Sequence, residues 1–201
     1  MENQDKKRVL IIEAALKRFA HYGLAKTTMS EIAKDISLSK ALLYYYFPDK
    51  ISLYVSTMEY LMQKISRDTV KSIDKASTAT EAVLKLLQKR QSYIQKYYNL
   101  FESSLTIGSD LPNDLSDKFA KAKAFEKIII NSLLTRGIAS NELVIEDPKL
   151  ATEIFIDAIS GIHFNILAKD KSIFPGKDQF KEIFHKEKAF ADIFMAGLSA
   201  R

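Results

Sequence analysis

The chain has 201 residues, with 30 Lys or Arg against 25 Asp or Glu and a formal net charge of +5. Six glycines and four prolines are too few for a turn-rich β architecture, and the lack of cysteine excludes disulfides, thiolate metal sites and cysteine nucleophiles. No apolar run approaches the roughly 20 residues of a membrane span, and the polar first residues differ from a signal peptide, so we expect a cytoplasmic protein without membrane contact.

The first expected element is an amphipathic helix in the N-terminal quarter. Ile12, Ala15, Leu16 and Phe19 recur at the spacing of one helical face. Gly23 follows where a helix C-cap is expected, because glycine adopts the left-handed backbone conformation that ends many helices. We therefore expect this helix to end near residue 22, with its apolar stripe buried.

Two short helices are predicted next, separated by a three-residue turn. Thr28-Met29-Ser30-Glu31 is a capping box, in which hydroxyl and carboxylate satisfy each other's backbone N–H groups, and it opens a helix to about Asp35. Ile36-Ser37-Leu38 forms the turn. Ser39 is a second N-cap candidate, for a helix over Lys40–Tyr46 that Pro48 stops.

The remainder of the chain also has helical periodicity throughout. Loops are expected at Gly108–Asn113, Arg136–Gly137 and Phe174–Gly176. The predicted fold is all-α with about nine helices: a three-helix helix-turn-helix domain over residues 1–50 and a helical bundle over residues 51–201. The further helices are expected over about 50–73, 80–98, 100–107, 114–135, 147–169 and 178–200.

No catalytic set or metal site is apparent in the sequence. It contains no glycine-rich phosphate loop, no Gly-x-Ser-x-Gly and no His-Glu-x-x-His. His21, His163 and His185 lie far apart without ligand partners, and His163, among apolar residues, is more typical of a hydrogen-bonded core histidine than of a catalytic one. We expect no enzyme activity, no cofactor and no metal.

The two short helices are compatible with a DNA-binding helix-turn-helix or with an ordinary helical corner. Three details favour a DNA-binding helix-turn-helix over a helical corner. Lys40 opens the second helix, where its side chain can reach base edges. Tyr44-Tyr45-Tyr46 cannot all be buried by one helix, and Lys50 opens the next helix, whose N-terminus attracts phosphate. Residues 1–50 also carry nine basic and six acidic residues, a weakly basic head.

The segments Thr27–Ala33 and Leu38–Leu53 resemble the TetR-family DNA-binding domain, over about residues 8–54. The hydroxyl cap, the turn, the Tyr–aromatic–Phe ending and the lysine all keep that family's spacing. Ser37 stands where the family usually has glycine, which implies either a less comfortable backbone or a slightly different turn. Ala41-Leu42 replaces a small polar pair, which favours contacts to thymine methyl groups. The resemblance implies that phosphates are contacted by Thr28, Tyr44 and Lys50. It implies that bases are contacted by Ser30, Lys40, Ala41 and Leu42. Tyr45 would contact either a phosphate or a base, and Ser39 is a further DNA-binding position.

The same resemblance implies a body that dimerises and binds an effector. Two stripes with small residues are either a four-helix dimer interface or internal packing: Ile154, Ala158, Gly161 and Asn165, and Phe190, Ile193, Phe194, Gly197 and Leu198. A second set is either an effector pocket or plain core, and its composition favours an apolar or amphipathic ligand: Met58, Met62, Tyr93, Tyr97, Phe101, Phe125, Ile129, Phe155 and His163.

Three function classes follow from these features. The first is a homodimeric, ligand-responsive transcriptional regulator, a repressor by resemblance, that binds an operator in double-stranded DNA and is released by a small molecule. The second is an all-α protein–protein adaptor whose helix-turn-helix is only a corner, and the third, an all-α enzyme, lacks a catalytic set. Binding to DNA that weakens steeply with salt separates the first from the second.

Overall fold

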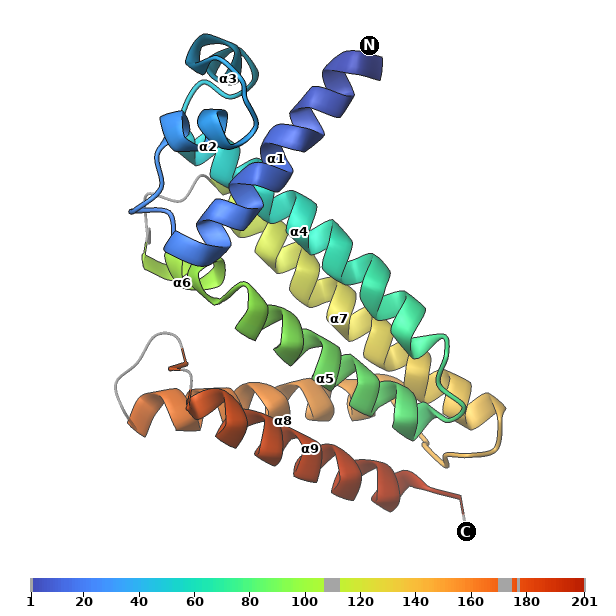
Figure 1. Ribbon diagram of the computed structural model, residues 1–201. Helices are drawn as coiled ribbons and strands as arrows, with labels where there is room; N and C mark the ends of the chain where they lie inside the picture. The colour runs from blue at the N-terminus through green and yellow to red at the C-terminus, as the bar shows by residue number, and fades with distance from the viewer. Residues whose placement is uncertain (1, 107–112, 170–174, 177, 201) are drawn as a thin grey trace. The chain divides into compact units, whose positions relative to one another are not determined.

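The computed structural model describes residues 2–106, 113–169, 175–176 and 178–200, and within these residues it contains nine helices (Figure 1). The only β pairing among them is an isolated bridge between Leu143 and Ser199. The predicted all-α class and helix number are confirmed. The helices are α1 (Glu2–Tyr22), α2 (Met29–Asp35), α3 (Lys40–Tyr46), α4 (Lys50–Ile73), α5 (Ala79–Lys96), α6 (Tyr98–Thr106), α7 (Asn113–Ala139), α8 (Pro148–Lys169) and α9 (Gln179–Leu198).

Helix α7 is the element whose end differs most from the prediction. It continues through Arg136-Gly137, where the sequence predicted a break. A Cβ added to Gly137 would lie 2.5 Å from Leu143 Cδ1 and 2.9 Å from Ala79 Cβ, so this glycine allows close packing rather than ending the helix. The loop predicted at Gly108–Asn113 lies outside the described residues except for Asn113, which begins α7. Of the loop predicted at Phe174–Gly176, the structure describes Pro175 and Gly176, which lie in no helix or strand.

The chain divides by packing into two compact units. Unit 1 comprises residues 1–65 and 96–116, and unit 2 comprises residues 66–95 and 117–201. This division follows contacts and not function, so the predicted functional boundary after residue 50 stays a prediction.

Unit 1 is built around the apolar stripe of α1, whose predicted residues Ile12, Ala15, Leu16 and Phe19 are all buried. The helix ends as expected: Gly23 has φ +76° and donates its N–H to Phe19 O at 2.9 Å. Helix α6 packs against α1. The Asn99 side-chain amide of α6 donates to the carbonyl oxygens of Ala20 and His21, at 3.0 and 2.8 Å, and so satisfies the C-terminus of α1.

Unit 2 has its own apolar core, contributed by α5, α7, α8 and α9. Phe155 of α8 contacts the rings of Phe190 and Phe194 of α9, with centroids 5.5 and 5.4 Å apart. Glu142 caps α5 from a distant part of the chain, because its carboxylate accepts from Ala79 N at 2.6 Å and Thr80 N at 3.1 Å. These contacts place α5, α8 and α9 around one region that is described below.

Helix α8 is the exception to the expectation of no membrane-length apolar segment. Among the described residues it is the one helix long and apolar enough, by length and composition alone, to cross a membrane. Its Phe155, Ile159 and Ile166 are buried in unit 2, whereas Ile154 and Phe164 are 50% and 73% exposed. The apolar character therefore comes from two faces, one packed in the core and one open.

Candidate nucleic-acid interface

The capping box predicted at Thr28 is present and fixes the start of α2. Thr28 Oγ1 accepts from Glu31 N at 3.3 Å, and Glu31 Oε2 accepts from Thr28 N at 2.9 Å and from the Thr28 hydroxyl at 2.7 Å. Both donors of Thr28 are thus directed at Glu31. A phosphate contact by this residue, as the sequence predicted, requires one of these bonds to be exchanged.

The turn between α2 and α3 shows the first of the two alternatives expected for Ser37, a backbone that suits glycine better. Ser37 adopts φ +54°, in the left-handed region that non-glycine residues avoid at a cost of roughly 1–2 kcal/mol. Backbone bonds from Ser37 N to Lys34 O and from Leu38 N to Ala33 O hold it. Ser39 then caps α3, because its Oγ accepts from Leu42 N at 3.1 Å.

Helix α3 presents one face outward and buries the other. Leu43 and Phe47 are buried within unit 1, whereas Tyr44 and Tyr45 are 41% and 71% exposed. Lys40 lies on the exposed face with its Nζ 5.8 Å from the centroid of the Tyr44 ring. The expectation that three consecutive tyrosines cannot share one core is confirmed. The predicted DNA-contacting residues Ser30, Ser39 and Ala41 are also exposed, and Leu42 is half-buried.

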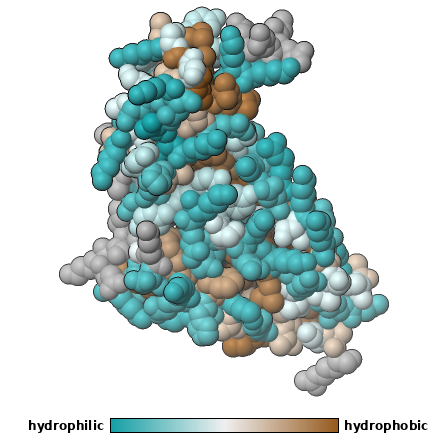
Figure 2. All heavy atoms as spheres, viewed as in Figure 1, coloured by the Kyte–Doolittle hydropathy of each residue, from teal (hydrophilic) through white to brown (hydrophobic). Residues whose placement is uncertain are grey.

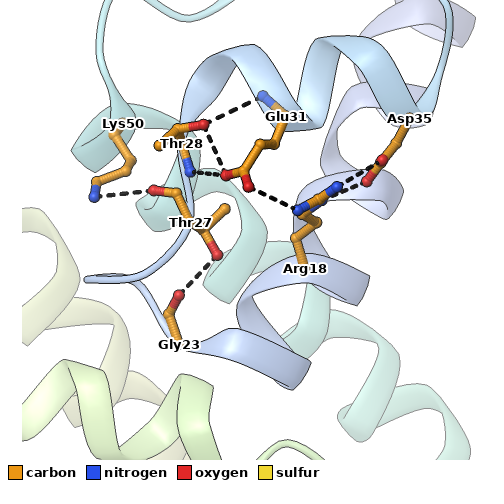
Figure 3. A network of polar contacts seen from close by, with 7 residues as sticks. All are labelled: Arg18, Gly23, Thr27, Thr28, Glu31, Asp35 and Lys50. Carbon is orange, nitrogen blue, oxygen red and sulfur yellow. Dashed lines mark hydrogen bonds and ion pairs between the residues drawn. The ribbon is translucent and has the colours of Figure 1, made fainter.

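Lys50 serves a structural role that the sequence did not indicate. Its Nζ donates to Leu24 O at 2.9 Å and to Thr27 O at 3.1 Å, in the connection between α1 and α2. Figure 3 shows the bond to Thr27. An ammonium group has three donors, so one remains for the predicted phosphate. Lys50 therefore ties the first residue of α4 to the segment that leads into the capping box.

Removing the Lys50 side chain should lower stability as well as DNA affinity. We expect Lys50→Ala to reduce the free energy of unfolding by about 1.5–3 kcal/mol, the range for hydrogen bonds to a charged group, and to lower the salt slope of DNA binding by about one unit. Thermal unfolding and salt titration measure both effects. The matched control is Lys26→Ala at an exposed lysine of the same connection; equal melting temperatures for the two variants would contradict the structural role.

Arg18 links α1 to both ends of α2. Its guanidinium bonds the Asp35 carboxylate through Nε at 2.5 Å and Nη2 at 2.8 Å, and its Nη1 lies 3.3 Å from Glu31 Oε1 (Figure 3). The hydrogen bonds from Arg18 hold the pKa of Asp35 below its usual value, and those from the Thr28 side chain and backbone do the same for the pKa of Glu31. The helix pair is thus positioned by bonds at both of its ends.

Replacement of Arg18 should be visible in the titration of Asp35. A carboxyl whose pKa is depressed by folding contributes stability above its unfolded pKa and loses it as pH falls through the folded pKa. We therefore expect Arg18→Gln to raise the pKa of Asp35 toward its ordinary value and to make unfolding less sensitive to acid. NMR titration of the side-chain carboxyl carbons measures this shift, and an unchanged Asp35 titration would contradict the pairing.

The residues of the predicted dimer stripes form an open surface of unit 2. Gly161 and Gly197 have no heavy atom within 4 Å of an added Cβ, and Ile154 and Ile193 are 50% and 73% exposed. Asn165 is exposed, Ala158, Phe190, Phe194 and Leu198 are half-buried, and Phe190 and Phe194 face Phe155 in part. Figure 2 shows hydrophobic atoms in the lower part of the view, where α8 and α9 lie in Figure 1.

The predicted pocket residues are distributed over both units. Helices α5, α8 and α9 line a cavity of about 140 Å³ in unit 2, and His163 is the one predicted residue on its wall. Ile129 and Phe155 belong to the buried core, Tyr93 bonds Asp68, and Phe125 is partly exposed. Met58, Met62, Tyr97 and Phe101 belong to unit 1, where Met58 and Tyr97 are buried.

The sequence analysis missed a charged cluster on the wall of this cavity. Arg90 donates to Glu126 at 2.7 Å and to Glu187, which also bonds His163. Burial opposes the charge of Arg90, but the two carboxylates outweigh it and raise the pKa of Arg90. Up to 97 positions separate the partners in sequence, so no local pattern could reveal the cluster.

Comparison with known proteins shows what the N-terminal residues and the fold of the chain are similar to. Residues 11–57 match the model of the bacterial regulatory proteins of the tetR family. The transcriptional regulator BetI of Agrobacterium fabrum is 35% identical over 75 residues, 37% of this chain and 36% of that protein. The chain thus aligns with little more than a third of this relative's length. The regulator YhgD of Bacillus subtilis is 24% identical over 80% of this chain and 84% of its own length.

Two solved structures extend the likeness to almost the full chain. A transcriptional regulator from Cytophaga hutchinsonii is 29% identical with a TM-score of 0.84, over 96% of this chain and 99% of that one. A regulator from Saccharomonospora viridis, in complex with choline, is 15% identical with a TM-score of 0.71, over 98% and 100%. The second likeness shows the fold alone.

The separate lines of observation agree. The capped helix pair with its exposed α3 face lies within the matched residues 11–57, and the fold of the whole chain follows that of regulators. These relatives are named as regulators, which confirms the prediction that the chain is not an enzyme. Residues 11–57 match the tetR family of bacterial regulatory proteins, and the chain is similar to transcriptional regulators over most of its length.

Proposed function

We propose that this chain is a ligand-responsive transcriptional regulator that binds a (pseudo)palindromic operator in double-stranded DNA as a homodimer. The observation that carries the proposal is the exposed face of α3, with Lys40, Tyr44 and Tyr45 directed outward from a helix-turn-helix whose two helices are both capped. A second helix held in this way suits insertion into the major groove. Ser30, Ser39, Ala41 and Leu42 would lie at the same contact, and Thr28 and Lys50 beside the phosphates.

The two parts of the chain that the sequence predicted have different functions in this proposal. Residues 1–50 read the DNA, and residues 51–201 dimerise and bind a small apolar or amphipathic molecule that releases the operator, as in a repressor. The regulator crystallised with choline is a case of this fold together with a small molecule. The protein would act in the cytoplasm, where its DNA target lies, with no membrane partner and no cofactor.

The dimer is proposed to form on the open stripes of α8 and α9. Ile154 and Phe164 of α8 and Ile193 of α9 expose large apolar side chains, and the open positions of Gly161 and Gly197 would let a second pair of helices approach. Two helices from each subunit would make a four-helix interface about a two-fold axis. Such a dimer presents two heads to two half-sites.

Lys40 is expected to contribute to base readout. Lys40→Ala should relax preference at one or two operator positions and cost roughly 1–3 kcal/mol on the operator, with a smaller effect on random DNA. Lys34→Ala, at an exposed lysine at the end of α2, is the matched control and should affect both DNAs alike. Fluorescence anisotropy on the two DNAs measures the difference; an equal loss for Lys40→Ala would make it a phosphate contact instead.

Selection of bound fragments from the source genome tests the function as a whole. The proposal predicts enrichment of fragments that share two inverted half-sites, with centres about 34–36 Å apart or a multiple of it. No enrichment over input DNA would contradict DNA recognition. A shared motif with one half-site would keep the head and contradict the dimer.

A further inference from the structure

The first part of α1 is a basic segment that lies outside the packed core of unit 1. Every residue at positions 5–10 is exposed, and Ile11 is the first buried residue among the described positions of the helix. This exposed part contains Lys6-Lys7-Arg8, three consecutive basic residues. The charge of the segment therefore faces the solvent rather than the core.

Arg8 is held beside the end of α3 by two contacts. Its guanidinium carbon lies 5.0 Å from the ring centroid of Phe47, the residue that directly follows α3, and its Nη2 donates to Ser56 Oγ of α4 at 3.2 Å. Figure 1 shows the beginning of α1 and α3 at the same end of unit 1. The side chain therefore has a defined position next to the helix that is proposed to enter the major groove.

The guanidinium of Arg8 keeps donors and charge for a partner. It has five N–H donors, and the bond to Ser56 is its one hydrogen bond among the described residues. Arg18 of the same helix, by contrast, pairs with Asp35 and lies 3.3 Å from Glu31. Within the described part of the chain, no carboxylate forms such an ion pair with Arg8. A positioned guanidinium with unused N–H groups suits a phosphate, which accepts two parallel N–H bonds from arginine.

We propose that Arg8 contacts a phosphate of the DNA backbone beside the major groove that α3 enters. Its guanidinium donates two N–H groups to the phosphate oxygens, while Phe47 and Ser56 hold it in place. This inference rests on the proposed DNA recognition and extends the DNA contact from the helix-turn-helix to α1. Because each nucleotide carries the same phosphate, the contact strengthens binding to every sequence without selecting among bases.

Removing the charge of Arg8 tests the contact through the salt dependence of DNA affinity. Fluorescence anisotropy of the full chain follows binding to a fragment selected from the genome and to a random duplex, from about 50 to 200 mM salt. We expect Arg8→Gln to lower the salt slope by about 0.9, so that its loss of affinity is about 3.5-fold larger at the lower salt concentration. The loss should be the same for both duplexes. Arg8 is exposed, so the variant is expected to fold, and thermal unfolding checks this.

Two further variants separate the phosphate contact from net charge and from packing. Lys17→Gln removes the same charge from an exposed position of α1, nine residues and about two and a half helical turns further on. Lys17 therefore faces away from Arg8, and its replacement should leave the slope unchanged. Arg8→Lys keeps the charge and should keep the slope, although it loses the planar contact with Phe47.

The outcomes that contradict the proposal are distinct from a failure of DNA binding as such. An Arg8→Gln protein with the wild-type slope would overturn the proposal and leave Arg8 a structural contact between α1, α3 and α4. A loss confined to the selected fragment would also overturn it, and would make Arg8 a base contact. Absence of salt-dependent binding in the wild-type chain would instead contradict the proposed function, and this inference with it.

Discussion

Replacing Gly161 with Leu is expected to leave the monomer folded and to abolish operator binding by separating the two subunits. An added Cβ at Gly161 meets no heavy atom within 4 Å, so the larger side chain has room in the single chain. In the proposed dimer the same position lies where a second helix approaches, and overpacking there costs typically about 1–3 kcal/mol. The two-fold axis applies this cost to both copies.

Light scattering and a gel shift measure the two consequences of Gly161→Leu. We expect a monomer mass, loss of the operator shift, and residual weak binding to any DNA through the intact head. Gln88→Leu, which adds the same side chain at an exposed position of α5, is the control and should remain dimeric. A Gly161→Leu protein that stays dimeric with full operator affinity would place the interface elsewhere.

Replacing Arg90 with Leu should give the largest loss of stability of any single change considered. It removes the guanidinium that pairs with Glu126, which is partly exposed, and with Glu187, which is 1% exposed and would keep only His163 as a partner. Breaking a buried ion pair from one side costs up to about 3–5 kcal/mol, because the remaining buried charge loses its partner. Urea unfolding measures the loss. Lys127→Leu breaks the exposed Lys127–Glu153 pair and should change the free energy of unfolding by only about 0–1 kcal/mol.

A double variant separates the lost charge balance from lost packing. If the uncompensated carboxylate causes the instability, Arg90→Leu combined with Glu187→Leu should recover much of it, since apolar replacement of a buried pair is often neutral. A double variant as unstable as the two single losses added together would contradict this explanation. It would then assign the effect to the packing of the Arg90 side chain.

The head was predictable because its signals are local. Thr28 and Glu31 are three residues apart, Ser39 caps the helix that follows it, and Gly23 ends the helix that precedes it, so each bond that sets an end is encoded within four positions. Tyr44, Tyr45 and Tyr46 likewise predicted an exposed face of α3, because three consecutive residues of a helix cannot all point into one core. These short-range patterns were sufficient for the boundaries of α2 and α3.

The contacts that the sequence did not reveal join residues far apart in the chain. The sequence predicted only a phosphate contact for Lys50. Its structural bonds to Leu24 and Thr27 could not be predicted, because they span more than 20 positions. The sequence predicted a helix end at Gly137. Its role in close packing could not be predicted, because its neighbours Ala79 and Leu143 lie outside α7. The Arg90 cluster needed α5, α7, α8 and α9 to be assembled first. Tertiary packing decides each of these roles.

The central claim, that the full chain binds operator DNA through its helix-turn-helix, is tested most directly by the salt dependence of its affinity. Fluorescence anisotropy should follow binding to a fragment selected from the genome and to a random duplex of equal length, from about 50 to 200 mM salt. The account predicts a linear fall of log affinity with log salt, and at least about a 10³-fold preference for the selected fragment. Affinity that is independent of salt, or equal for both duplexes, would contradict it.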